Sequence, residues 1–162
     1  MEPGSQAPIA VGTAVVEVTH SYYPLLDYDG FPDILPDAGV ANGLVAPGST
    51  GANILTGLFW GPVRVTVEIY VAAPALDLGT WEDVVETSLF TDSGTISAPV
   101  PLDDTAPPLP QLNVDPESWF RVRAHARGRE AARGMVLAPA EPPEEHLLQM
   151  WPAPKADEVM YR

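Results

Sequence analysis

The stretch Val63-Arg64-Val65-Thr66-Val67-Glu68-Ile69-Tyr70-Val71 decides the fold class of this 162-residue chain. Its odd-numbered residues are all apolar and β-branched, and its even-numbered residues carry polar groups. Successive side chains of a β-strand point to opposite faces of the sheet. A period of two over this length therefore predicts a strand with one face against a core and the other face toward water.

The same alternation returns near the carboxyl end of the chain, over residues 119–127. Other β-rich runs are separated by Gly, Pro and Asn-Gly turn signals, and together they predict seven or eight short strands. The 19 prolines and 13 glycines disfavour long helices. We therefore expect an all-β domain, a sandwich of two antiparallel sheets, with a small barrel as the alternative.

The expected domain covers residues 13–154, with a flexible arm at 1–12 and a frayed tail at 155–162. Residues 99–110 hold five prolines and predict an extended connection. Asp92-Ser93-Gly94 predicts a hairpin turn between a strand that begins near Val84 and a strand at residues 95–97. Residues 133–137 are expected to form a further strand.

Composition also limits the class of protein. The chain has no cysteine, which excludes disulfides and thiolate metal sites. Its start lacks the basic and apolar regions of a signal peptide, and no apolar run approaches the ~18 residues of a membrane helix. We expect a cytoplasmic protein that does not bind membranes.

The charge of the chain is strongly negative and unevenly distributed. Residues 1–117 hold 16 acids and one base, a net charge of −15, whereas residues 118–162 carry +1, which gives the total of −14. Such a surface repels nucleic acid and attracts basic proteins. The plainer interpretation is that surplus acids keep a small protein soluble. The carboxylates expected to bind a partner lie in two loops and are Asp27, Asp29, Asp33, Asp37, Asp103 and Asp104.

A second candidate surface is the polar face of residues 119–127. Alternation places three arginines on one side of this strand, together with an aromatic residue and His125. The residues of this candidate surface are Trp119, Arg121, Arg123 and Arg127. We expect these arginines to pair with acids on neighbouring strands, such as Glu68 or Glu86, and the alternative is a carboxylate-binding partner surface.

No pattern of residues predicts catalysis or a cofactor. Asp92-Ser93-Gly94 has the form of an aspartic-protease tripeptide, but a hairpin turn explains it better. Asp27-Tyr28-Asp29-Gly30 does not match the spacing of an EF-hand, although a calcium site of another kind stays open. The three histidines lack metal-binding spacing. We expect a non-enzyme without metal or cofactor.

Six segments in order resemble a group of small acidic bacterial proteins without assigned activity. They are residues 18–23, 42–45, 61–67, 81–86, 120–129 and 148–152. More distantly, an early strand with a His-aromatic step, a Gly-rich middle and the pattern of residues 120–125 resemble the competence protein J family. That resemblance implies an inhibitor of a DNA-entry nuclease, and it assigns no binding residue.

The sequence thus predicts a binding protein. Its expected partner is a basic nuclease or toxin, which it would neutralise as an inhibitor or immunity protein. The alternative is a scaffold module of a larger or homo-oligomeric complex, suggested by aromatic residues expected at the surface, among them Tyr23, Phe59, Trp60 and Trp151. No interaction with nucleic acid is expected.

Overall fold

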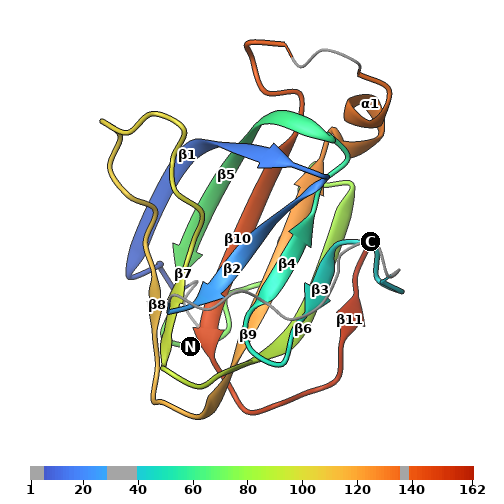
Figure 1. Ribbon diagram of the computed structural model, residues 1–162. Helices are drawn as coiled ribbons and strands as arrows, with labels where there is room; N and C mark the ends of the chain where they lie inside the picture. Colours follow the sequence, from blue (N-terminus) through green and yellow to red (C-terminus); the bar gives the residue numbers. More distant parts are fainter. Residues whose placement is uncertain (1–5, 29–39, 136–138) are drawn as a thin grey trace.

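The computed structural model describes residues 6–28, 40–135 and 139–162, and within these ranges the chain is all-β (Figure 1). The strands form one curled, open sheet, a half-barrel, in the order β11-β6-β9-β10-β5-β1-β2-β4-β3, and β7 and β8 extend it from β2. The expected sandwich of two separate sheets is not observed. The strands are β1 (Ala10–Thr19), β2 (Tyr22–Asp27), β3 (Val45–Pro47), β4 (Ala52–Leu55), β5 (Trp60–Ile69), β6 (Asp83–Thr91), β7 (Thr95–Ser97), β8 (Leu112–Asn113), β9 (Ser118–Arg127), β10 (Glu145–Pro152) and β11 (Val159–Met160).

Strand β5 is central to the sheet, and its apolar face is buried as the sequence predicts. Val63, Val65 and Val67 are fully buried in the concave core. β5 pairs with β1 in antiparallel register along ten residues and with β10 in parallel register. The parallel pair is possible because the long excursion through β6 and β9 returns the chain to β5.

The curl of the sheet encloses a single hydrophobic core and brings its two ends together. Phe120, Leu148 and Met150 fill the interior. The backbone N–H of Gly51, in the β3–β4 turn, donates to the Phe90 carbonyl of β6 at 3.1 Å. The Asn42 side chain reaches Glu158 next to β11 at 2.7 Å. These bonds link opposite ends of the sheet order, so the fold lies nearer to the small-barrel alternative than to the sandwich.

Four sequence-based expectations about elements differ from the structure. β7 follows the predicted turn but pairs with β2 and β8, and not with β6. Residues 133–135 of the strand expected over 133–137 form no strand, and the last two residues of that range lie outside the described residues. A short helix, α1 (Arg129–Arg133), ends at the first residue of that range and begins after Gly128, which is in the left-handed region. The expected frayed tail is also wrong, since β11 pairs with β6. The first strand likewise begins at Ala10, inside the expected arm.

Candidate functional site

The carboxylate of Asp27 faces inward and caps the β6–β7 turn. It is 8% exposed. Thr91 Oγ1 and Ser93 Oγ donate to Asp27 Oδ1 at 2.6 and 2.5 Å, and the Asp92 backbone N–H donates to Oδ2 at 2.8 Å. Asp27 is therefore a turn-stabilising residue, which corrects its expected role in partner binding. Most of the hydrogen-bonding capacity of this carboxylate is used inside the protein, and little of its surface is open to a cation.

Asp27 should make stability depend on pH in the acid range. Burial opposes ionisation, but hydrogen bonds from Ser93, Thr91 and the turn backbone together lower the pKa of Asp27 below its ordinary value of 3.8. A depressed folded-state pKa contributes stability that is present above the ordinary value and is lost as the pH falls through the folded-state value. We expect urea unfolding of the Asp27→Asn variant to respond less to acidification below about pH 4 than the parent does. Asp104→Asn, on an exposed connection, is the control, and equal acid responses of Asp27→Asn and the parent would refute this role.

The other expected partner-binding carboxylates are distributed differently. Asp103 and Asp104 are exposed on the extended connection that runs beside β1. The Thr105 hydroxyl and backbone N–H donate to Asp103, which lowers its pKa. Asp29, Asp33 and Asp37 lie outside the described residues, so the expected acidic loop and its calcium alternative are not tested.

The arginine face of β9 is largely internal. Arg121 Nε donates to one oxygen of Glu86 at 2.9 Å, and Arg123 Nε donates to the other at 2.8 Å. The remaining donors of Arg121 reach the carbonyls of Ala156 and Asp157. The carboxyl-terminal segment thus covers this ion cluster on the outer face of the sheet. Glu86 is one of the two partners expected from the sequence, and the cluster is a structural element and not an open surface.

The two other members of this candidate surface lie at opposite ends of β9. Arg127 contacts Glu145 at 2.9 Å, and its guanidinium lies 4.5 Å from the centroid of the Trp81 ring. Trp119 packs edge-on against Phe90 and carries the Lys155 ammonium 4.8 Å above its ring. Trp119 is partly exposed. Arg127 is partly exposed as well, and Trp119 is the member of this set that borders an acidic region.

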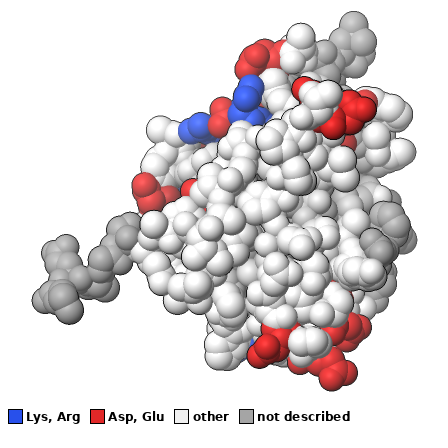
Figure 2. All heavy atoms as spheres, turned by 90° about the vertical axis from the view of Figure 1, so that its left-hand side faces the viewer, with Lys and Arg blue, Asp and Glu red and all other residues white. Residues whose placement is uncertain are grey.

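We name that region the acidic end and define it by Asp92, Asp115 and Glu117. The Glu117 N–H donates to the Asp92 carbonyl at 3.0 Å, which joins the β6–β7 turn to the β8–β9 connection. All three side chains are exposed, and no ion pair to them is present among the described parts of the chain. Figure 2 shows one group of acidic atoms at the bottom of the molecule and other acidic atoms near the top and left, and most of the visible Lys and Arg atoms lie near the top.

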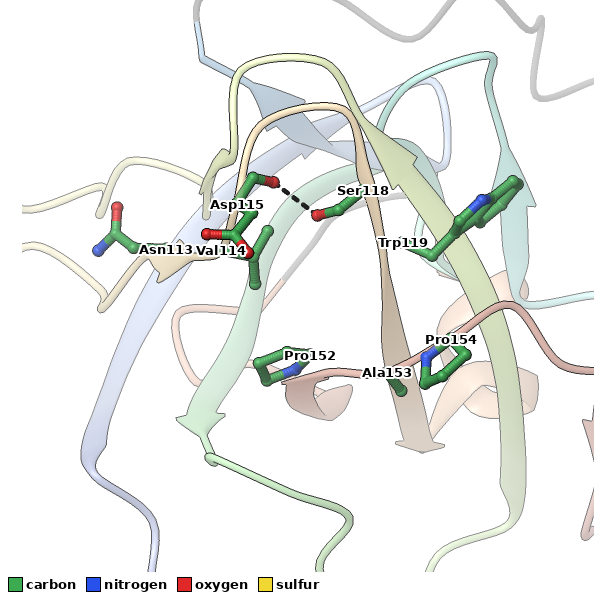
Figure 3. A pocket seen from close by; sticks show the side chains of 8 residues that line it. All are labelled: Asn113, Val114, Asp115, Ser118, Trp119, Pro152, Ala153 and Pro154. Carbon is green, nitrogen blue, oxygen red and sulfur yellow. Dashed lines mark hydrogen bonds between the residues drawn. The ribbon is translucent and has the colours of Figure 1, made fainter.

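A groove borders the acidic end and has a volume of about 660 Å³. Asp115 and Ser118 line one side, and Pro152 to Pro154 line the other, with Trp119 at one end (Figure 3). The Ser118 hydroxyl donates to the Asp115 carbonyl at 2.5 Å and braces the loop. Carboxylate, aromatic ring and proline side by side form a surface suited to a Lys or Arg side chain. Sequence reasoning identified Trp119 but missed Asp115 and Glu117, because nothing local joins them to Asp92.

A buried polar chain lies inside the half-barrel, at the end away from the groove. The Tyr23 hydroxyl bonds His146 Nδ1 at 2.8 Å, and His146 Nε2 lies 2.5 Å from Glu144 Oε2. Burial, followed by the nearby charge of Glu144, raises the pKa of Tyr23 well above its ordinary value. Tyr23 was expected among the exposed aromatic residues, as was Trp151, and both are buried. These groups are buried, so their hydrogen bonds stabilise the interior of the half-barrel.

In the described part of the chain, no arrangement of side chains supports an aspartic-protease site or a cluster of the three histidines. Asp92 stands exposed on its turn, and the neighbouring Asp27 bonds its backbone instead of sharing a proton with its carboxylate. The three histidines lie apart: His20 is exposed, His125 is on the outer face and His146 is in the core. Within residues 6–28, 40–135 and 139–162, no three His, Cys, Asp or Glu side chains cluster as metal ligands. No helix in these ranges is long and apolar enough to cross a bilayer.

Fold and site together define the class: an all-β half-barrel domain with an acidic end and an adjacent groove. No family model matches the chain, and no curated protein matches it either. A solved structure titled "Crocagin biosynthetic gene J" is similar, with a TM-score of 0.52 and 15% sequence identity, covering 89% of this chain and 99% of that one. At that identity the similarity shows the fold alone. These comparisons do not support the expected relation to the competence protein J family.

Proposed function

We propose that this chain is a non-catalytic binding domain that docks a basic protein partner through its acidic end. The observation that carries the proposal is that the basic side chains are bonded within the protein, whereas the carboxylates of the acidic end are not. All eight Lys and Arg side chains make intramolecular contacts, five of them in ion pairs of 2.9 Å or less. The exposed carboxylates of the acidic end are not neutralised in this way, so they are available for intermolecular pairing.

The groove supplies the second requirement of a protein interface, an apolar surface inside the charged rim. Trp119, Pro152 and Pro154 supply apolar contact area, and the carboxylates of the acidic end supply electrostatic attraction. Lys155 already lies over the Trp119 ring and shows that the ring accepts an ammonium group. A nuclease or toxin with a basic surface has the required chemistry, and an inhibitor or immunity role is the specific form of this proposal.

The test uses two variants of equal net charge. In the first, Asp92→Asn, Asp115→Asn and Glu117→Gln remove the acidic end, and in the matched control, Asp103→Asn, Asp104→Asn and Glu82→Gln remove three other exposed acids. Each protein is immobilised and exposed to a lysate at about 50 mM salt, and retained basic proteins are identified by mass spectrometry.

We expect the parent and the control to retain the same basic protein and the acidic-end variant to lose it. The affinity of the parent for this basic protein should fall by about tenfold or more between 50 and 200 mM salt. Retention that is equal for both variants would show general charge attraction and contradict docking at the acidic end. Capture of no basic protein by the parent would contradict the proposal as a whole.

A further inference from the structure

A second pocket lies at the other end of β9, about 30 Å from the acidic end at roughly 3.3 Å per strand residue. It has a volume of about 390 Å³ and is lined by residues of the β1–β2 turn, the β4–β5 loop and α1. The residues that line it and carry the argument are His20, Ser21, Leu55, Phe59, Arg129 and Arg133. Two guanidinium groups in one pocket are unexpected in a chain with a net charge of −14.

Arg129 is the unusual member of this pocket because it is buried with few partners. Its side chain is 9% exposed. Nη2 donates to the Gly43 carbonyl at 2.6 Å, and Nη1 is 3.7 Å from Asp83, but Nε has no hydrogen-bond partner in the described residues. Burial, the largest influence, lowers the pKa of Arg129. A buried guanidinium with five donors normally finds more acceptors than these. Nε itself is sealed from solvent, so an anion would meet the part of the Arg129 side chain that stays exposed.

The surroundings of Arg129 favour an anion on one side only. Asp83, Glu82 and Glu130 border the hollow on its other side, where a second anion would be repelled. The β1–β2 side holds Arg133, His20 and the Ser21 hydroxyl, and no carboxylate among the described residues lines it. The buried carboxylate of Glu144, which acts electrostatically on Arg129, is bonded to the Gly57 and Leu58 amides of the β4–β5 loop. Arg133 pairs with Glu130 at 2.5 Å, but both side chains are exposed, so this pair can open toward a bound anion.

The pocket is held in shape before any ligand arrives. A Cβ on Gly57 would lie 2.0 Å from the Arg129 carbonyl, so the β4–β5 loop packs directly against the start of α1. The Ser21 N–H donates to the Phe59 carbonyl at 3.1 Å, and the Thr56 N–H donates to the Ser21 carbonyl at 2.8 Å. His20 packs edge-on against Phe59, whose ring is 58% exposed. Preorganisation lowers the entropic cost of binding.

We propose that this pocket binds a small organic carboxylate that carries an aromatic or other flat apolar group. Its carboxylate accepts hydrogen bonds from Arg129 and Arg133, and its apolar group packs on Phe59 and Leu55. A planar guanidinium matches a carboxylate in bidentate geometry. Phe59 and Leu55 give the pocket an apolar wall that inorganic phosphate would not use. This site is independent of the acidic end.

The test uses 3-phenylpropionate as the probe, its neutral amide as the matched compound, and inorganic phosphate as the simple anion. Binding to the full chain is measured by calorimetry and by NMR shifts of the residues lining the pocket. The variants are Arg133→Gln and Phe59→Ala, both at exposed side chains whose loss should leave the fold intact, and Arg129→Gln, with folding checked by circular dichroism. Arg64→Gln is the control, because Arg64 also forms a surface ion pair, with Glu141.

We expect saturable binding of the carboxylate with a dissociation constant below about 10 mM, weakened about fivefold or more in Arg133→Gln and in Phe59→Ala. Arg129→Gln should abolish it, while Arg64→Gln and the acidic-end variant should bind as the parent does. Equal binding of the amide, or unchanged binding in Arg133→Gln and Phe59→Ala, would overturn the proposal. If phosphate bound as tightly as 3-phenylpropionate, the claim that the site selects an organic carboxylate would be overturned. If no probe showed saturable binding, the whole proposal would be overturned.

Discussion

Replacing Glu86 with glutamine should lower the free energy of unfolding by about 3 kcal/mol or more, because it leaves two buried guanidinium groups without their shared counter-charge. The side-chain exposures are 5% for each of Arg121 and Arg123 and 11% for Glu86. Glutamine keeps the size of the residue and removes its charge, so the loss measures electrostatics and not packing. Urea unfolding followed by far-UV circular dichroism gives the value.

Two controls separate this effect from general sensitivity to mutation. Glu141→Gln removes a 2.7 Å ion pair with Arg64 in which the glutamate is 85% exposed, and it should cost less than about 1 kcal/mol. The triple replacement Glu86→Leu, Arg121→Met and Arg123→Met removes the whole cluster and should be less destabilising than Glu86→Gln alone. If Glu86→Gln lowered the free energy of unfolding no more than Glu141→Gln does, the carboxyl-terminal segment would not seal the cluster from solvent.

The second large effect is expected at Glu144, inside the half-barrel. Its Oε1 accepts the backbone N–H groups of Gly57 and Leu58, both at 3.0 Å, and its Oε2 lies 2.5 Å from His146. In Glu144→Gln an amide NH₂ must face either these donors or the imidazole, so at least one buried polar group loses its acceptor. We expect the free energy of unfolding to fall by about 2–4 kcal/mol.

The neighbouring Glu145 provides the matched control for this prediction. It pairs with Arg127 at 2.9 Å with its side chain 40% exposed, so Glu145→Gln should cost less than about 1 kcal/mol. Amide hydrogen exchange adds a second measurement, because the Gly57 and Leu58 amides should lose protection in Glu144→Gln. Unchanged protection would contradict the role of Glu144 as the acceptor that holds the β4–β5 loop.

The pairing of strands was less predictable than the strands themselves. Alternation identified the buried face of β5 and the two faces of β9, because side-chain direction along a strand is a local property. The β10–β5 parallel pair joins residues about 80 positions apart, and β7 pairs with β2 across the molecule. Such partners are chosen by the packing of the whole core, for which a sequence period carries no signal.

In the candidate site, too, some contacts were predictable from the sequence and others were not. Glu86 was among the expected partners of the β9 arginines because cross-strand charge pairing follows from register and sign. The position of Asp27 was misjudged, because its loop is rich in acids and turn residues and looks solvent-exposed in the sequence. Its partners are Thr91 at the end of β6 and Ser93 in the following turn, 64 and 66 residues away.

The sequence by itself determined that this protein is all-β, that it carries a surplus of 14 negative charges, and which face of β5 is buried. Only the tertiary structure decided where the surplus charge is neutralised and where it is not. Ion pairing depends on distances of a few ångströms between side chains, and only folding brings Asp92 beside Asp115 and Glu117 while it places Arg129 at the opposite end.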